Sequence, residues 1–381
     1  MRLIYPLLWS RPGRQADREQ VVNTAGAMAR AGAEVTLVLP RGADDPRVTA
    51  DELRALFAVT GDFQVEQRRT RWAGEQALPS LLWLRQLAHD PATGRHEIFY
   101  SRMPVAFAFG GAAPIPFAVE HYRPWPDTIP PLRPLIRRTA RAPHCLGFIL
   151  HSRYAADSFA RAGVGEDKLL VAHNGAEPAR MLPRLTRAEA RAALGLPADR
   201  PIALYAGRIN ARKGLDRILL LAASRPDVLF LLVGSEGEGP VEGAAAPLPN
   251  VRVVPWQDPA GLAAWLYAAD ILLIPPSRAP LERFGQTVLP MKTFAYLAAG
   301  RPILAPIAPD TAELLRDDDN ALLVPPEDEA AAASALDRLL GDPALAERLG
   351  ANAAALAGSL SWDARARRIL GFLEARLSCR G

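Results

Sequence analysis

The strongest constraint on the fold is an alternation of short apolar runs with amphipathic stretches along most of the chain. In the first half, apolar runs at residues 3–9 and 34–39 flank a stretch at residues 18–31 with helical periodicity. Further strand candidates lie at 97–100, 116–119, 147–151 and 168–172. Strand–helix alternation of this kind predicts a parallel sheet with helices on both faces.

The same alternation restarts after a break in the middle of the chain. Asn174-Gly175 is a turn signal, and residues 178–197 are polar and contain proline. Strand candidates then follow at 202–205, 228–233, 251–254, 271–274, 303–305 and 322–324. The sequence therefore predicts an α/β fold of two doubly wound, Rossmann-like domains in tandem.

We place the two domains at residues 1–178 and 179–361. The last segment, residues 362–381, is amphipathic and leaves two alternatives open. It caps its own domain, or it crosses back and packs on the first domain, which is the alternative we favour. Ligands of doubly wound sheets bind beyond the carboxyl ends of the strands, so we expect a site in a cleft between facing domains.

Composition excludes several classes of protein. A chain of 381 residues with 49% hydrophobic and 23% charged residues is typical of globular domains and not of disordered ones. No run of about 18 apolar residues predicts a membrane span, and we interpret the apolar N-terminus as a buried strand. Cys145 and Cys379 fit neither a disulfide framework nor a metal site, so we expect a reducing, cytoplasmic location.

The charge pattern argues against a nucleic-acid partner. A net charge of +4 is small for this length and diffuse. One local cluster stands out, formed by Arg133, Arg137, Arg138 and Arg141. One interpretation is contact with a phosphorylated acceptor or with an anionic membrane surface, at the inner face of the cytoplasmic membrane. The other, which we favour, is a solvated helix face.

Only three of the 45 basic residues are lysines: Lys168, Lys213 and Lys292. The Ala, Arg, Pro and Gly content indicates a GC-rich genome, which favours arginine at any surface position that needs a cation. A surviving lysine can be one whose compact ammonium meets a phosphate where a guanidinium would not fit. The alternative is chance. With their flanking residues, Lys213 and Lys292 suggest a diphosphate site in the second half.

The turn after the strand at 202–205 has the chemistry of an anion site. Gly207 allows close backbone approach, and Arg208 and Lys213 can converge on an anion at the N-terminus of the next helix. Gly234 begins a second glycine-bearing turn after a later strand. That second signal is weaker alone, because glycines after strands are common.

The most specific pattern lies between residues 282 and 302. It contains Glu282-Arg283-Phe284-Gly285 and Pro290-Met291-Lys292, and it ends in Ala298-Ala299-Gly300-Arg301-Pro302. With the turn at 207–214, this pattern resembles the retaining glycosyltransferases of family 4. The resemblance covers essentially the whole chain and implies the GT-B architecture, with two Rossmann-like domains facing across a cleft.

The resemblance implies roles for the strand-end residues of the second domain. Arg208 and Lys213 would bind the diphosphate of a nucleotide-sugar donor and stabilise it as it leaves. Glu282 would orient the transferred sugar, together with the backbone around Phe284 and Gly285. No metal is required if the Arg–Lys pair neutralises the diphosphate, and no cofactor is implied beyond the donor itself.

The start of the helix after residue 291 also belongs to the implied donor site. Lys292 and Thr293 lie there, and the lysine would add positive potential at the phosphates. The family's ribose-binding glutamate would fall at Ala295 or Pro290, so this carboxylate is missing. An alternative therefore stays open, a non-catalytic relative that has lost donor turnover, although retention of Arg208, Lys213 and Glu282 speaks against it.

In the first domain, Glu120-His121 follows a strand and precedes Tyr122-Arg123-Pro124-Trp125. The resemblance would place His121 in the cleft, near the donor sugar and diphosphate. We assign Arg123 and Trp125 to the acceptor. The structural alternative for His121 is an ordinary hydrogen-bonded loop histidine.

These expectations combine into one predicted activity. The chain would be a metal-independent, retaining glycosyltransferase of cell-envelope polysaccharide synthesis that moves a sugar to a glycan or lipid-linked acceptor. The resemblance implies a same-face route in which the departing diphosphate takes the acceptor proton. A nicotinamide oxidoreductase is disfavoured, because no G-x-G-x-x-G followed by an acidic residue occurs.

Overall fold

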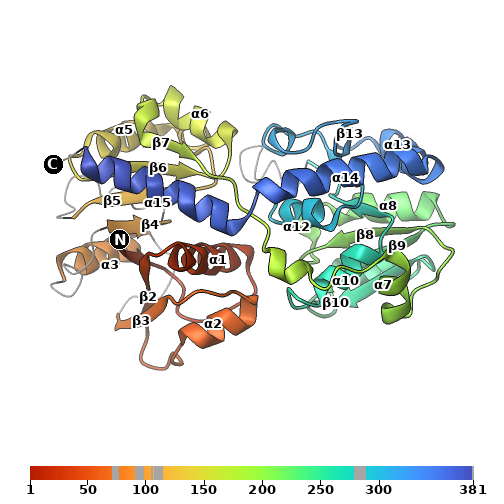
Figure 1. Ribbon diagram of the computed structural model, residues 1–381, viewed down its shortest axis with the longest axis horizontal. Coiled ribbons are helices and arrows are strands. Elements are labelled where there is room, and N and C mark those ends of the chain that lie inside the picture. Colours follow the sequence, from red (N-terminus) through yellow and green to blue (C-terminus); the bar gives the residue numbers. More distant parts are fainter. Residues whose placement is uncertain (71–76, 91–97, 104–105, 107–114, 279–288, 380–381) are drawn as a thin grey trace. The chain divides into compact units, whose positions relative to one another are not determined.

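The computed structural model describes residues 1–70, 77–90, 98–103, 106, 115–278 and 289–379 (Figure 1). The chain divides into two compact units, Met1–Asn174 with Trp362–Gly381, and Gly175–Ser361. The division lies between Asn174 and Gly175, slightly before the 178/179 boundary that composition suggested. The last strand of the first sheet ends at Val171, and the stretch from Gly175 onward belongs to the second unit.

The first unit is built on a seven-stranded sheet in the order β3-β2-β1-β4-β5-β6-β7. Every pairing in it is parallel. Its strands are β1 Arg2–Pro6, β2 Glu34–Arg41, β3 Gln64–Arg69, β4 Ile98–Ser101, β5 Phe117–His121, β6 Cys145–Leu150 and β7 Leu169–Val171. Its helices are α1 Ala16–Arg30, α2 Ala50–Phe57, α3 Ala77–His89, α4 Trp125–Thr128, α5 Arg133–Arg141, α6 Arg153–Arg161 and α15 Trp362–Ser378.

The second unit repeats this winding in a six-stranded sheet, in the order β10-β9-β8-β11-β12-β13. Its strands are β8 Ile202–Ala206, β9 Leu229–Ser235, β10 Val251–Pro255, β11 Ile271–Leu273, β12 Ile303–Pro306 and β13 Leu322–Val324. Its helices are α7 Arg187–Leu194, α8 Leu215–Ser224, α9 Pro240–Ala245, α10 Leu262–Ala268, α12 Lys292–Ala299, α13 Glu329–Gly341 and α14 Pro343–Ser359. The predicted fold class, two doubly wound α/β domains, is confirmed.

Burial on both faces explains why the strands read as continuous apolar runs. In β8, Leu204 belongs to one hydrophobic cluster and the next residue, Tyr205, belongs to another on the opposite face. Both side chains are almost fully buried. Because helices cover both faces, only the strand ends are open to polar chemistry. The switch points of the two sheets lie between β1 and β4 and between β8 and β11, where such sheets bind ligands.

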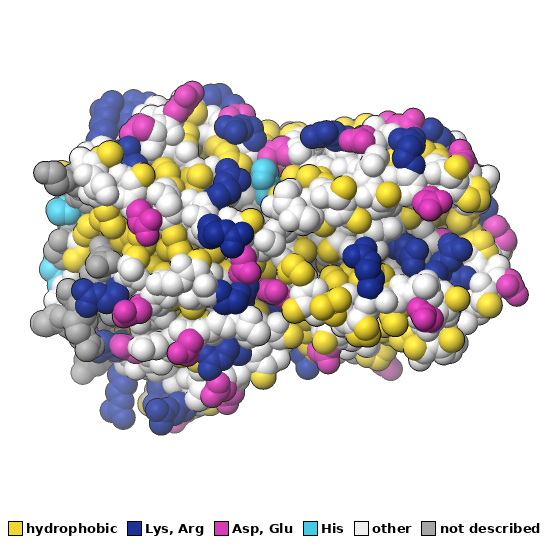
Figure 2. Space-filling model, in the orientation of Figure 1, with side chains coloured by type: hydrophobic (Ala, Val, Ile, Leu, Met, Phe, Trp, Pro, Cys, Tyr) yellow, Lys and Arg dark blue, Asp and Glu magenta, His cyan; other side chains and the backbone are white. Residues whose placement is uncertain are grey.

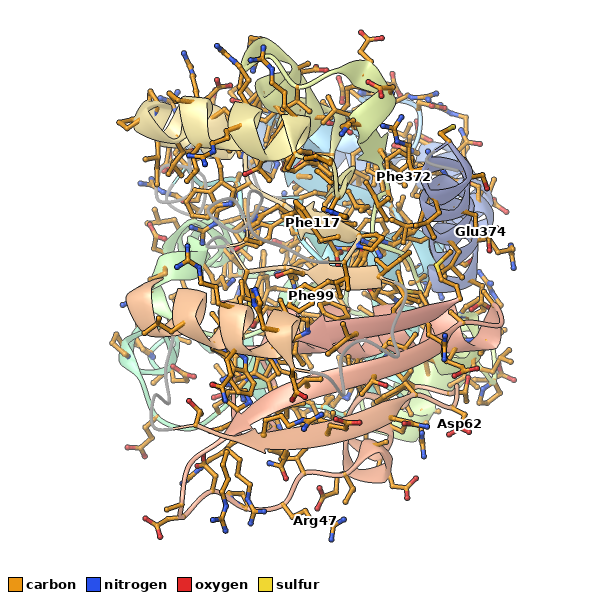
Figure 3. The ribbon with its side chains drawn as sticks, turned by 90° about the vertical axis from the view of Figure 1, so that its left-hand side faces the viewer. Arg47, Asp62, Phe99, Phe117, Phe372 and Glu374 are labelled. Atoms are coloured by element: carbon orange, nitrogen blue, oxygen red, sulfur yellow. The ribbon has the colours of Figure 1, made fainter. Side chains whose placement is uncertain are left out.

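The last helix, α15, packs within the first unit against α1 and β6. Trp362, Ile369 and Leu373 form its buried face, whereas Glu374 is exposed. Figure 3 shows Phe372 and Glu374 on this helix and, on neighbouring strands of the sheet, the paired residues Phe99 and Phe117. The apolar periodicity of residues 362–377 therefore belongs to the core of the first unit.

The basic cluster forms α5, which buries Ile136, Thr139 and Ala140. Arg133 pairs with Asp127 at 3.1 Å, and Arg137 donates to the Ala162 carbonyl oxygen at 3.0 Å. Figure 2 shows basic and acidic side chains interspersed over the face in view. No helix among the described residues is long and apolar enough to cross a bilayer.

Candidate active site

The turns after β8 and β9 meet backbone to backbone. The Gly207 N–H donates to the Val233 carbonyl oxygen at 2.9 Å. A Cβ added to Gly234 would lie 2.3 Å from the Gly207 carbonyl oxygen, and the φ angle of Gly234 is 126°. Only glycine satisfies both conditions. Gly234 is predicted as a donor ligand, and its lack of a side chain allows the Gly207 turn to pack directly against the turn after β9.

The loop after Gly207 turns through a short 3₁₀ helix, η6 Ala211–Lys213, into α8. The Asn210 side chain accepts a hydrogen bond from the Arg212 N–H at 3.1 Å and so starts the η6 turn. A Cβ on Gly214 would lie 2.3 Å from Cβ of Ser277, so this loop packs closely on the segment after β11. Lys213 is exposed at the end of the turn, beside the N-terminus of α8.

Lys292 approaches the same turn from the start of α12. Its Nζ lies 3.3 Å from the ring centroid of Tyr205, the next-to-last residue of β8, and so makes a cation–π contact. A Cβ built on Gly207 would lie 3.2 Å from this Nζ. The two lysines and the glycine turn that the sequence picked out therefore converge at one end of β8.

Two buried tyrosines, which sequence reasoning missed, hold these parts together. The Ala206 N–H donates to the Tyr296 hydroxyl at 2.7 Å, and that hydroxyl donates to the Leu273 carbonyl oxygen at 3.2 Å. The Tyr205 hydroxyl donates to the Arg208 carbonyl oxygen at 3.0 Å. Tyr296 thus ties α12 to the ends of β8 and β11. In the sequence, the indication of this role was the position of Tyr296 one helical turn after Lys292.

Among the residues that the structure describes, the site carries positive charge without a matching carboxylate. Burial lowers the pKa of Lys292 well below its usual value, and the neighbouring Lys213 lowers it further. Although the Lys213 residue as a whole is exposed, desolvation of its ammonium, and then Arg208, likewise lower its pKa. Within the described ranges neither lysine has a carboxylate at ion-pair distance, and Arg208 has only a 3.4 Å contact with Glu236. Such a cluster is suited to a multiply charged anion.

The structure describes some of the remaining predicted donor residues, and others lie outside the described ranges. Thr293 is fully buried, and its hydroxyl has no hydrogen-bond partner among the described residues. Ala295 packs against the hydrophobic cluster under the sheet, so a core contact occupies the position expected for a ribose-binding carboxylate. Glu282, Phe284 and Gly285 lie outside the described residues.

Glu327 holds the segment that leads toward residue 282. Its N–H donates to the Pro276 carbonyl oxygen at 2.8 Å, and its Oε1 accepts from the Arg278 N–H at 2.7 Å. Its Oε2 pairs with Arg217 of α8 at 2.5 Å. Glu327 adopts a left-handed φ of 66°, which is rare for a residue with a side chain. Strain of this kind persists only where the surroundings demand it.

In the first unit, His121 ends β5 and is 3% exposed. The Trp125 indole N–H donates to its ring, 2.8 Å from Nδ1, and the two rings meet edge to face. Burial lowers the pKa of His121 well below its usual value, and Arg102 reinforces the shift. Arg123 stacks over Tyr122 and Trp125. His121, Arg123 and Trp125 therefore form one cluster, with His121 neutral.

Two family models match the chain, one in each half. "Glycosyltransferase Family 4" matches residues 19–180, and "Glycosyl transferases group 1" matches residues 186–356. Both models describe glycosyltransferases, and together they span most of the chain. The resemblance seen in the motifs is thus confirmed, and the matches extend over both sheets.

The curated relatives match about half of this chain, whereas the similar solved structures match nearly all of it. It is 36% identical over 217 residues to a D-inositol 3-phosphate glycosyltransferase of Streptomyces scabiei, over 52% of this chain and 47% of the relative. The chain spans about half the length of the curated relatives it matches. Its fold is that of sucrose-phosphate synthase from Thermosynechococcus elongatus (TM-score 0.78, 20% identity, all of both chains). HepE from Anabaena, solved in complex with UDP-glucose, is also similar (TM-score 0.74, 17% identity, 98% of this chain and all of that one).

A buried aspartate after β12 makes a pH-dependent contribution to the stability of this glycosyltransferase fold. Asp310 is 1% exposed, and burial raises its pKa from 3.8 to about 7, although Oδ1 accepts from the Thr311 N–H at 2.8 Å. The folded state therefore binds more protons than the unfolded chain between these values, so stability falls as pH rises from 4 to 7. The ionised form costs about 4 kcal/mol.

We expect Asp310→Asn to remove this dependence, because the amide oxygen keeps the hydrogen bond without the charge. Denaturant unfolding at several pH values measures it. The variant should match the wild type near pH 4 and exceed its stability above pH 7. Equal stability of the two proteins at pH 8 would contradict the assignment.

Proposed function

We propose that this protein transfers a sugar, with retention of configuration, from a nucleotide-diphosphate sugar to a glycan or lipid-linked acceptor. The observation that carries the proposal is the convergence of Lys213, Lys292 and Arg208 on the Gly207 turn, with no carboxylate partner for either lysine among the described residues. A diphosphate supplies the missing negative charge. Cations aimed at the leaving diphosphate stabilise it as charge develops.

The proposed division of labour follows from the chemistry of each group. Arg208 and Lys213 neutralise the leaving diphosphate at the N-terminus of α8, where the helix dipole adds to their effect. Lys292 gives further charge from a protected position on the Tyr205 ring. Glu282 orients the sugar. The transfer needs no metal in this scheme, and the departing diphosphate takes the acceptor proton on the same face.

His121 contributes as a neutral group. A buried, uncharged imidazole can donate a hydrogen bond to a sugar hydroxyl or accept one from it. Arg123 and Trp125 contact each other, and Trp125 contacts His121; these two residues are the proposed acceptor surface. Membrane contact through α5 and a cytoplasmic location stay predictions.

A thermal-shift panel tests the donor class. UDP, GDP, ADP and TDP, each with matched sugar nucleotides, are added to the wild type and to Lys213→Ala. UDP-sugars come first, because HepE was solved with UDP-glucose. A ligand at a hundredfold excess over its Kd should stabilise the wild type by about 2.7 kcal/mol. That response should vanish in Lys213→Ala.

Lys168→Ala is the control. Lys168 donates to the Ala140 and Cys145 carbonyl oxygens in the first unit, so its loss changes stability but not the ligand response. No shift with any nucleotide would contradict the donor proposal. A shift without release of nucleoside diphosphate would support the non-catalytic alternative that Ala295 raises. The anomeric configuration of the product, read by NMR, tests retention.

A further inference from the structure

One arginine of the last helix reaches the carboxyl ends of three neighbouring strands in the first sheet. Arg365 of α15 is 4% exposed. Its guanidinium pairs with Glu120 of β5 at 2.5 Å, lies 3.4 Å from His151 Nε2 after β6, and donates to the Ala172 carbonyl oxygen after β7 at 3.3 Å. It also donates to Thr24 of α1 at 3.2 Å. These partners satisfy a guanidinium that is almost fully buried, and they link it to the ends of the strands.

Glu120 is the centre of these contacts and is fully buried. Its Oε2 accepts from the Tyr5 hydroxyl at 3.0 Å. Its Oε1 accepts from Arg365, from Gln20 at 2.5 Å and from His151 Nε2 at 2.6 Å. Burial alone would raise the pKa of Glu120, but Arg365 and His151 outweigh it and hold the pKa well below its usual range. The carboxylate therefore stays ionised inside the protein.

These contacts adjoin His121, the next residue along β5. The His151 N–H donates to the His121 carbonyl oxygen at 3.1 Å, while its ring donates to Glu120. The ends of β5 and β6 are thus linked through both backbone and side chain. Burial lowers the pKa of His151 to about 4, against the opposing effect of Glu120, so this ring is neutral near pH 7.

We propose that Arg365 is a positioning residue for His121: through Glu120 and His151 it fixes the strand end that carries this histidine. The last helix begins directly after the second unit, and its Arg365 thus supplies a buried contact at the carboxyl ends of the strands of the first sheet. The inference rests on the proposed function only for the role of His121. The geometric part, Arg365 acting on His151 through Glu120, stands by itself.

The balance of charges around Glu120 predicts the effect of losing Arg365. The titratable or charged groups that act on the Glu120–His151 pair are Tyr5, Tyr100, Arg102, His121 and Arg365. Among these five, Arg365 is the charged group that forms an ion pair with the carboxylate. Without Arg365, the buried Glu120 carboxylate lies beside the His151 ring with no cation paired to it. The Glu120–His151 pair then binds a proton more readily. We expect the pKa of His151 to rise by about one to three units.

Histidine NMR on the full chain tests this without any assumption about activity. The chain has six histidines, so side-chain ¹⁵N signals can be assigned by single His→Gln variants. In the wild type, the His151 ring should stay neutral from pH 5 to 8. In Arg365→Met it should titrate in this range, and Arg365→Lys should restore the neutral ring in part. An unchanged His151 titration in folded Arg365→Met would overturn the inference.

A double-mutant cycle with Glu120→Gln separates positioning from simple anchoring. Glu120→Gln keeps the shape and removes the charge, so Arg365→Met should add little further change to His151 in that background. If the two changes instead add, Arg365 does not act through Glu120, and the proposal fails. Glu120→Gln with Arg365→Met also removes both buried charges, which guards against a single variant that does not fold.

The enzymatic arm uses whichever sugar nucleotide the thermal-shift panel identifies. A positioning role predicts that Arg365→Met lowers kcat tenfold or more, with a smaller change in the donor KM, and adds an ionisation between pH 5 and 8 to the kcat/KM profile. A wild-type profile in a variant with altered His151 titration would overturn the link to His121. If no donor is found, the proposed function fails, while the NMR result still decides the Arg365–Glu120–His151 relation.

Discussion

Lys292→Met should raise the melting temperature of the donor-free protein and abolish its response to the nucleotide. The ammonium is held against Tyr205 and has no carboxylate partner among the described residues. An unpaired buried charge costs stability, and the cation–π contact returns only part of it, so we expect a net gain of about 1 kcal/mol. Differential scanning calorimetry with and without donor measures both effects.

The pH dependence gives an independent check on the same residue. Burial, then Lys213, lowers the pKa of Lys292, so the folded state binds fewer protons than the unfolded chain in alkaline solution. Stability of the wild type should therefore rise with pH from the lowered pKa up to that of a free lysine. In Lys292→Met this contribution is absent, and the gain over wild type should shrink as pH increases.

Lys168→Met is the matched control for this substitution. Its Nζ donates to two carbonyl oxygens, from Ala140 and Cys145, at 2.7 and 3.0 Å. Removing it leaves both acceptors without that donor, so stability should fall while the donor response is kept. A lower melting temperature in Lys292→Met, as in the control, would mean that Lys292 serves the fold and not the ligand.

Gly234→Ala should destabilise the second unit by about 3 kcal/mol or more. Two costs add: a φ of 126° that disfavours a side chain, and a Cβ only 2.3 Å from the Gly207 carbonyl oxygen. Because backbone cannot move aside as a side chain tip can, the turns after β8 and β9 must separate. Chemical denaturation measures the loss, and the donor response should weaken with it, since the Gly207 turn carries Arg208.

Gly237→Ala separates the two costs. Gly237 has a similar φ of 140°, but nothing lies within 4 Å of its added Cβ. It should therefore show only the conformational cost, about 1–2 kcal/mol. Equal losses in the two variants would contradict the close approach of the two turns.

The strand-end motif shows how far sequence reasoning reached in the candidate site. Gly207, Arg208, Lys213 and Lys292 lie together as the order of the motifs predicted, because carboxyl ends of parallel strands share one edge of a sheet. The partners of these residues were not predictable in the same way. Nothing local to Lys292 indicates that it rests on the Tyr205 ring. Gly234 stays a predicted donor ligand, and its close contact with the Gly207 backbone was not foreseen.

The first unit shows the larger gap. The pair Glu120-His121 attracted notice for the histidine alone, yet the buried contacts converge on the glutamate. Arg365 was one of many arginines in an amphipathic helix whose pattern indicated only an apolar face. Its partner lies 245 residues earlier in the chain. Such a pair becomes visible only when α15 lies against the sheet.

Local pattern alone determined that this chain forms two doubly wound sheets and which turns carry cations. Periodicity and strand-end glycines are properties of neighbouring residues, and they act before distant parts meet. Tertiary structure decided which of the charges are buried and what they touch. Burial and pairing depend on surfaces far apart in sequence, and the energy of a charge inside a protein is set by those surroundings.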